Sequence, residues 1–166
     1  MAVIVKVIRH SDGGSAYLRN MCWYVRDERK LAYGGYGVNI SDFQTAYEQM
    51  ECLRRYYSQV STNPLVHIII SFDEETDNIQ FAVANAHKIA SYFMKEYIYL
   101  WCIHKKDEEC SHIHMHLLLN SVNLKNGKLF HSGIYEMNEF CYHIQKITHM
   151  EWKLVFAKSN NRQDHI

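Results

Sequence analysis

The sequence predicts an α+β domain, in which a central antiparallel sheet carries helices on one face and leaves the other face open to a ligand. Three observations support this prediction. Amphipathic helical patterns alternate with apolar runs rich in β-branched residues. Two of these runs, 97–104 and 112–122, follow each other without an intervening helix, so we expect them to pair as antiparallel neighbours. The 166 residues, 48% of them hydrophobic, are enough for one domain with a buried core.

The first half of the chain carries two predicted strands and two predicted helices. β-Branched runs predict the strands, and apolar residues at i, i+3 and i+4 predict the helices. Asp42 is expected to cap the second helix, and the glycine- and tyrosine-rich segment 33–37 is expected to be a flexible loop. In order, these elements are a strand at 2–9, a helix at 15–27, a helix at 43–59 and a strand at 65–72.

The second half continues with the same kinds of pattern. A long helix is expected to begin at Thr76 or Asp77. The remaining predicted elements are strands at 97–104 and 112–122, a short strand or irregular crossing at 128–131, a helix at 133–149 and a strand at 151–157. Such an order is typical of ferredoxin-like and RNA-recognition-motif domains. We expect residues 1–157 to form one domain, and the polar tail 158–166 to be disordered or to begin a linker.

Composition excludes several classes of protein. No apolar run approaches the ~20 residues that a membrane span needs, so membrane insertion is not expected. Lys6 and Arg9 interrupt the N-terminal apolar run, which argues against a signal peptide. Five cysteines without CxxC spacing indicate reduced thiols and a cytoplasmic protein. The formal net charge of zero gives no global signature of a nucleic-acid binder, although a local basic patch is compatible with it.

Histidines are concentrated in the predicted strand 112–122. Alternate residues of a strand point to one face, so His112, His114 and His116 are expected to form a row. His104 closes the preceding strand and adds a fourth imidazole nearby. The alternative is a solvated sheet face that happens to carry histidines. Several imidazoles at one level favour a metal site, and a ligand set without thiolates suits a catalytic divalent ion with open coordination positions.

Such an ion polarises an anionic substrate, and a phosphodiester is the obvious candidate. The reaction then needs a nucleophile, which is either a metal-activated water or a side chain. Among the twelve tyrosines, Tyr24 is distinguished by its place at a helix end, beside a basic cluster and just before the Gly-rich segment. The alternative is that Tyr24 is an ordinary helix aromatic.

Three segments carry motifs. Residues 23–30 read WYVRDERK, residues 66–72 read VHIIISF, and residues 102–128 contain CIH, HIHMHLLLNSVN and NGK. In this order, and over about residues 1–157, they resemble the motifs of the relaxase or mobilisation nuclease family. The resemblance implies the HUH-type relaxase fold. It also implies a metal-dependent, site- and strand-specific endonuclease that nicks single-stranded DNA at an origin of transfer through a 5′-phosphotyrosyl intermediate and so starts conjugation.

The resemblance also implies roles for individual residues. Tyr24 would be the nucleophile, and His104, His114 and His116 would hold a divalent ion, Mn²⁺ or Mg²⁺. Lys106 replaces the family's usual Asp, and Asp107 or Glu108 could orient a ligand in its place. His112 could orient a ligand, contact a phosphate or be a residue of the rim. His67 matches a family position and could be a ligand, could support a ligand from behind or could pack in the core. The residues expected to contact DNA are Arg26, Arg29, Lys30, Tyr33, Tyr36, Lys125 and Lys128. Accessory relaxosome and coupling proteins are the expected partners.

Three other functions remain open from the sequence. A rolling-circle replication initiator uses the same chemistry with a tyrosine after the histidine motif, which would be Tyr135 or Tyr142. A non-catalytic single-strand-binding module would use the aromatic residues to stack bases. A metal-dependent phosphohydrolase would use water in place of a tyrosine. The dependence of any DNA cleavage on Tyr24 discriminates among these functions.

Overall fold

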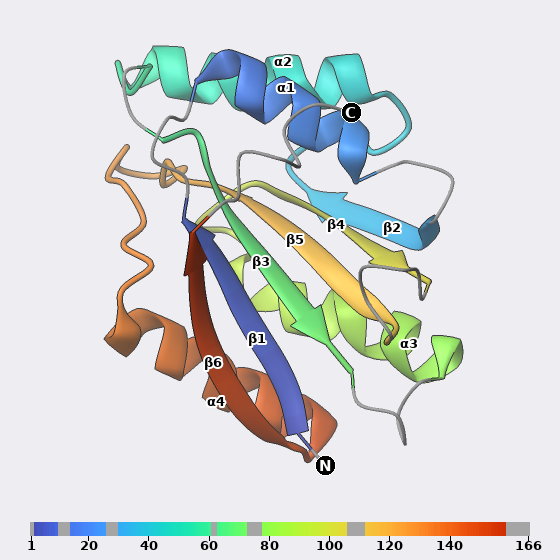
Figure 1. Cartoon of the computed structure of the whole chain (residues 1–166). Coiled ribbons are helices and arrows are strands. Elements are labelled where there is room, and N and C mark those ends of the chain that lie inside the picture. Colours follow the sequence, from blue (N-terminus) through green and yellow to red (C-terminus); the bar gives the residue numbers. More distant parts are fainter. Residues whose placement is uncertain are drawn as a thin grey trace.

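The computed structural model describes residues 2–9, 14–25, 30–60, 63–72, 78–105 and 112–158. These residues form one six-stranded sheet with four α-helices (Figure 1). The strands are β1 (Ala2–Arg9), β2 (Lys30–Tyr36), β3 (Leu65–Ser71), β4 (Tyr99–His104), β5 (His114–Asn120) and β6 (Glu151–Lys158). The helices are α1 (Ser15–Tyr24), α2 (Phe43–Tyr56), α3 (Ile79–Ala90) with a following 3₁₀ turn, η2 (Ser91–Phe93), and α4 (Ile134–Thr148).

The sheet is mostly antiparallel, which confirms the predicted α+β class. Its strand order is β2-β4-β5-β3-β1-β6. Only the pairing of β1 with β6 is parallel among the described strands; β4 and β5 pair as antiparallel neighbours, as predicted. The strands β4 and β5 therefore lie inside the sheet, and β2 and β6 form its two edges.

Helices cover one face of the sheet completely and the other face in part. On the first face α3 and α4 pack over a core that includes Val5, Trp101 and Phe140. On the second face α1 and α2 pack over β4 and β5 through a smaller core that includes Leu18 and Leu100. The prediction of helices on one face is correct for β1 and β6 and wrong for β4 and β5. Every residue of β4 and β5 is buried, and a strand of this kind needs cover on both sides.

The segment expected to be a flexible loop is a strand, so that prediction is wrong. Residues 33–37 belong almost entirely to β2, which pairs with β4 along the edge of the sheet. A Cβ atom on Gly34 would lie 2.6 Å from the indole of Trp101, and one on Gly35 would lie 2.6 Å from the carbonyl oxygen of Tyr99. The glycines therefore permit close packing of β2 on β4. In the sequence alone, such a pair of glycines looks the same as the glycines of a turn.

Several element boundaries also differ from the sequence prediction. The α2 helix begins after Asp42, whose side chain accepts a hydrogen bond from the Gln44 amide, as predicted, but it ends at Tyr56. The α3 helix is capped by Asn78, not by Thr76 or Asp77. Residues 128–131 are the irregular crossing, with one bridge between Val122 and Leu129. The tail beyond residue 158 lies outside the described residues.

The fourth predicted strand is shorter than expected. It begins at His114, not at His112, and ends at Asn120. Both neighbouring strands end opposite His114, since His114 pairs with Ser71 of β3 and with His104 of β4. His112 therefore lies before the paired region, and the predicted row of three histidines on one strand is reduced to two.

Candidate functional site

Three buried histidines meet where β4 and β5 lie side by side. His104 is the last residue of β4, and His114 and His116 alternate along β5 on the same face. One ring nitrogen from each lies within 4.8 Å of the other two. All three side chains are at most 4% exposed. The structure thus brings together the three residues that the resemblance to relaxases implied as a ligand set.

The donor set fits a divalent ion with open coordination positions. Neutral imidazoles bind such ions, and a fixed group of three leaves sites for water or substrate oxygens. Cys22 of α1 is buried in the core under that helix, where burial raises the pKa of its thiol to about 12. Among the described residues the metal-binding group contains neither a thiolate nor a carboxylate.

Hydrogen bonds orient two of the imidazoles. His114 donates from Nδ1 to the carbonyl oxygen of His112 at 3.0 Å, and His104 donates from Nε2 to the carbonyl oxygen of Val25 at 3.3 Å. A carbonyl oxygen only accepts, so each of these nitrogens carries the proton. The lone pair then lies on Nε2 of His114 and on Nδ1 of His104, where a metal ion could bind it.

The third imidazole is oriented by another histidine. Nε2 of His67, on β3, lies 2.9 Å from Nδ1 of His116, and the two rings are stacked with centroids 5.2 Å apart. His67 is buried, so it belongs to the floor of the site and not to its rim. If Nδ1 of His116 donates to His67, the Nε2 lone pair of His116 is available to an ion.

Tyr24 lies over the histidine cluster. It is the last residue of α1, and its ring is half-buried with centroids 5.3 Å from His116 and 5.7 Å from His104. Both contacts are edge-on. The next residue, Val25, supplies the carbonyl that holds His104. The end of α1 is therefore fixed against the cluster by its side chain and by its backbone.

The other predicted site residues are dispersed. Lys30 pairs with His104 across the edge of the sheet, and its Nζ lies 5.9 Å from the ring of Tyr33, which shares that face. Tyr36 points to the opposite face, where it contacts Tyr99. His112 is half-buried and contributes its carbonyl oxygen to the site. Four predicted residues lie outside the described part of the chain: Arg26, Arg29, Asp107 and Glu108.

Lys125 and Lys128 follow the far end of β5, so the structure does not bring them to the histidines. Nζ of Lys125 forms an ion pair of 2.5 Å with Glu96, and this hydrogen bond holds the pKa of Glu96 below its ordinary value. Asn123 also donates to Glu96. The segment that leads into the Asn-Gly-Lys turn is thus held by contacts with Glu96, beyond the end of β5 that is farther from the histidines.

Comparison with known families agrees with this geometry. A sequence model described as "Relaxase: MobA/VirD2-like, nuclease domain" matches residues 17–149. The chain belongs to the MobA/VirD2-like relaxase family. A solved structure titled "Molecular Basis of Vancomycin Resistance Transfer in Staphylococcus aureus" has the same fold, with a TM-score of 0.62 and 13% sequence identity. The alignment covers 96% of this chain and all of the other. A search of curated proteins finds no significant match.

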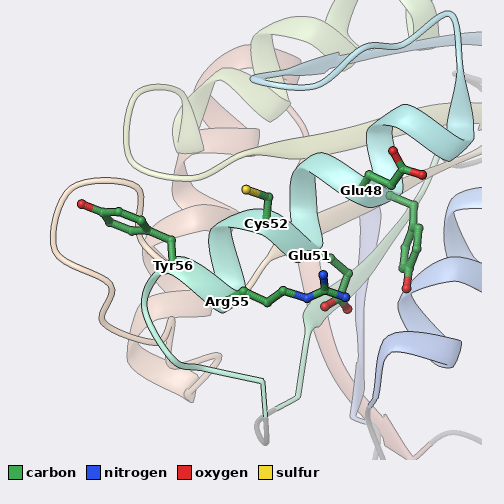
Figure 2. Close-up of a pocket in the computed structure, with 6 residues that line it drawn as sticks. Glu48, Glu51, Cys52, Arg55 and Tyr56 are labelled. Carbon is green, nitrogen blue, oxygen red and sulfur yellow. The ribbon is translucent and has the colours of Figure 1, made fainter.

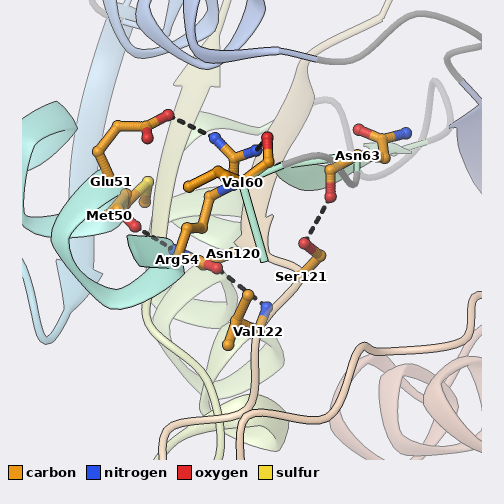
Figure 3. Close-up of polar contacts among 8 residues, drawn as sticks. All are labelled: Met50, Glu51, Arg54, Val60, Asn63, Asn120, Ser121 and Val122. Atoms are coloured by element: carbon orange, nitrogen blue, oxygen red, sulfur yellow. Dashed lines mark hydrogen bonds and ion pairs between the residues drawn. The ribbon is translucent and has the colours of Figure 1, made fainter. Parts of the chain in front are cut away.

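In this relaxase domain the NSVN segment has a structural task. Asn120 donates to the Met50 carbonyl of α2 and accepts from the Val122 amide, while Ser121 donates to the Asn63 carbonyl (Figure 3). These bonds tie α2 to the end of β5 that lies opposite the histidines. The residues of this motif therefore stabilise the fold of the relaxase domain, and they do not line the histidine site.

A depression of about 420 Å³ on the relaxase domain lies on α2 and not at the histidines (Figure 2). It is lined by Tyr47, Glu48, Glu51, Cys52, Arg55 and Tyr56. All these residues come from one helix, and they include both acidic and basic side chains. We assign no function to this depression, because it has neither the convergent polar groups nor the enclosure of a binding site.

Sequence reasoning missed two basic residues on the same face of the sheet as the histidines. Lys6 on β1 and Lys153 on β6 are exposed, and neither was among the predicted DNA contacts. The sequence did contain a signal for Lys6, because this lysine interrupts the β-branched run of β1 at a position that alternates with apolar residues.

Among the described residues of the relaxase domain, no helix is long and apolar enough to cross a membrane.

Proposed function

We propose that this chain is a metal-dependent relaxase that nicks single-stranded DNA at an origin of transfer and starts conjugative transfer from the cytoplasm. Its cleavage would be site- and strand-specific. One observation carries the proposal: the ring of Tyr24 lies 5.3 Å from His116 and 5.7 Å from His104, over a group of three buried imidazoles. A phenol beside a potential metal site suits attack on a phosphodiester.

The proposed reaction is a transesterification. The Tyr24 oxygen forms a bond to the scissile phosphorus as the bond from phosphorus to O3′ breaks. Tyrosine loses its proton and the departing O3′ gains one, which leaves a 5′-phosphotyrosyl adduct and a free 3′-OH. His104, His114 and His116 would hold a divalent ion, Mn²⁺ or Mg²⁺, which would supply positive charge beside the scissile phosphate. One phosphodiester replaces another, so the strand can later be rejoined without ATP.

The surrounding groups support this arrangement of ligands. His67 and the carbonyl oxygens of His112 and Val25 each contact a different histidine of the cluster. Partners of this kind fix the tautomer and the orientation of a ligand imidazole. We therefore propose that His67 is a positioning residue that acts through His116. Asp107 and Glu108 stay candidates for the same task on the basis of the sequence.

The placement of the other tyrosines favours Tyr24 as nucleophile. Tyr135 and Tyr142, which a rolling-circle initiator would use, are exposed residues of α4. This helix packs on the face of the sheet opposite to the histidines. Each of these tyrosines is separated from the cluster by the thickness of the sheet, so the relaxase chemistry is preferred over that of an initiator.

Capture of a covalent adduct tests the proposal. A random-sequence pool of single-stranded DNA, labelled at the 3′ end, is incubated with the protein and Mn²⁺ or Mg²⁺ and analysed under denaturing conditions. We expect a labelled protein band that disappears with chelator or with Tyr24→Phe. The matched control, Tyr56→Phe, changes an exposed tyrosine of α2 and should keep the band.

Two outcomes identify the alternatives. Cleavage without any adduct indicates a phosphohydrolase that uses water. Binding that is indifferent to chelator, with neither cleavage nor adduct, indicates a non-catalytic single-strand-binding module. The sequence of the captured DNA would define the recognition site, and it would provide the substrate with which to look for accessory relaxosome and coupling proteins.

A further inference from the structure

The face of the sheet that carries the histidines continues over β1 and β6, where no helix of the described residues packs on it. The α1 and α2 helices pack over β4 and β5, and their core contains no residue of β1 or β6. Ile4 is 40% exposed although β1 is an interior strand, whereas its neighbours Val3 and Val5 are fully buried on the opposite face. An interior strand of the sheet therefore presents one side to solvent, where a ligand can reach it.

Strand register connects this face directly to the histidines. Opposite residues in paired strands share a face, so two rows can be followed across the sheet. One row runs from His116 through Ile69 and Lys6 to Val155, and the other from His114 through Ser71 and Ile4 to Lys153. We call the six residues beyond the histidines the open strip.

The distances within the strip are short. Neighbouring strands lie about 4.8 Å apart, so the backbone at Lys6 is roughly 10 Å from that at His116, and the backbone at Lys153 is roughly 14 Å from that at His114. A lysine side chain spans several ångströms more. A DNA strand with one phosphate at the histidines could therefore reach both ammonium groups with its neighbouring phosphates.

The chemistry of the strip matches a single strand of DNA. Two exposed lysines supply positive charge for phosphates, and the apolar side chains of Ile4 and Ile69 offer surface to unstacked bases. The strip itself contains no carboxylate; Glu151 lies on the same face but pairs with Ala2, one row beyond. The positive charge of the strip is therefore complementary to a polyanion such as a DNA strand.

We propose that the open strip binds the single-stranded DNA immediately next to the phosphodiester engaged at the histidines. The inference rests on the proposed function, since it assigns a path to the substrate of that site. Lys6 and Lys153 contact phosphates, and Ile4 contacts bases. Binding along the strip is independent of cleavage, so it can be measured without metal.

The test is the affinity of the full chain for fluorescein-labelled oligothymidine, measured by anisotropy in chelator over a series of salt concentrations. For Lys6→Gln/Lys153→Gln we expect weaker binding, with the slope of log K against log salt reduced by about 1.4, or about 0.7 for each phosphate contact. Ile4→Thr, which keeps a β-branched residue, should weaken binding and leave the slope unchanged. Thermal melts confirm that each variant is folded.

A matched control is Lys88→Gln/Lys146→Gln, which removes two exposed lysines from α3 and α4 on the covered side of the sheet. Equal effects of the two pairs would overturn the open strip as the binding path, as would failure of the unmodified protein to bind oligothymidine. If either outcome occurs and the unmodified protein still forms an adduct with the DNA pool, the proposed function stands and only the path is wrong. If the unmodified protein binds oligothymidine through the strip but forms no adduct with the DNA pool, the proposed function is contradicted and the path stands.

Discussion

At the scale of single residues, the site depends on which nitrogen of each imidazole carries a proton. Alternation along β5 was enough to predict that His114 and His116 share a face, whereas the choice of His104 as the third member of the group came from the resemblance to relaxases. The sequence could not show that His112 falls outside the strand, because this boundary is set by where β3 and β4 end. Nor could it show that His67 points toward His116, because apolar residues flank His67 on both sides in a mostly buried strand and the alternation gives no polar face.

Substitution of His67 tests its role. The Oε1 atom of glutamine can occupy the position of Nε2 and accept a hydrogen bond, whereas leucine fills the space without accepting one. We expect His67→Leu to weaken Mn²⁺ binding by about 10–100-fold, and His67→Gln to retain most of the affinity. Calorimetry gives the Kd, and ¹⁵N chemical shifts of the His116 ring in metal-free protein give its tautomer.

The tautomer measurement separates positioning from packing. In the unmodified protein and in His67→Gln, we expect the proton of His116 on Nδ1. In His67→Leu we expect the Nε2-protonated form to increase. If leucine and glutamine variants share one tautomer and one Kd, His67 only fills space beneath His116.

At the scale of elements, the sequence predicted the type of most segments but not β2. Asp42 capped α2 as expected, because an N-cap is a local signal. The identity of β2 depends on Trp101 and Tyr99, which are distant in sequence and leave no room for a side chain at the two glycines. The cover of β4 and β5 by α1 and α2 is also a non-local property. It places Tyr24 on the histidine face, which the pattern of either helix alone did not indicate.

Stability of α2 depends on a buried ion pair. Arg54 is fully buried, bonds Glu51 at 2.5 Å and donates to the Val60 carbonyl (Figure 3). Arg54→Met leaves the buried Glu51 carboxylate without this partner, so we expect a loss of about 3–5 kcal/mol in the free energy of unfolding. Removing both charges in Glu51→Met/Arg54→Met should restore a large part of it. Urea denaturation measures both, and equal stabilities of single and double variants would contradict this account.

At the scale of the whole molecule, metal binding is expected to stabilise the fold. The proposed ligands come from β4 and β5, whose pairing is lost on unfolding, so an ion that binds only the folded chain raises its stability. At a metal concentration one hundred times the Kd this amounts to about 2.7 kcal/mol. For a chain of this length it corresponds to a Tm increase of roughly 5–10 °C.

Thermal melts with and without Mn²⁺ test this linkage. We expect the increase in the unmodified protein and its loss in His114→Ala. The control is His87→Ala, which removes an exposed histidine of α3 on the other side of the sheet. A metal-dependent increase that survives His114→Ala and disappears in His87→Ala would place the ion elsewhere.

The central claim is that Tyr24 attacks DNA over the histidine cluster. Its most direct test is mass spectrometry of the adduct formed with single-stranded DNA and Mn²⁺, after digestion with protease and nuclease. We predict a nucleotide phosphate attached to the peptide that contains Tyr24 and to no other tyrosine peptide. A nucleotide on Tyr135 or Tyr142, or efficient cleavage with every tyrosine unmodified, would contradict the claim.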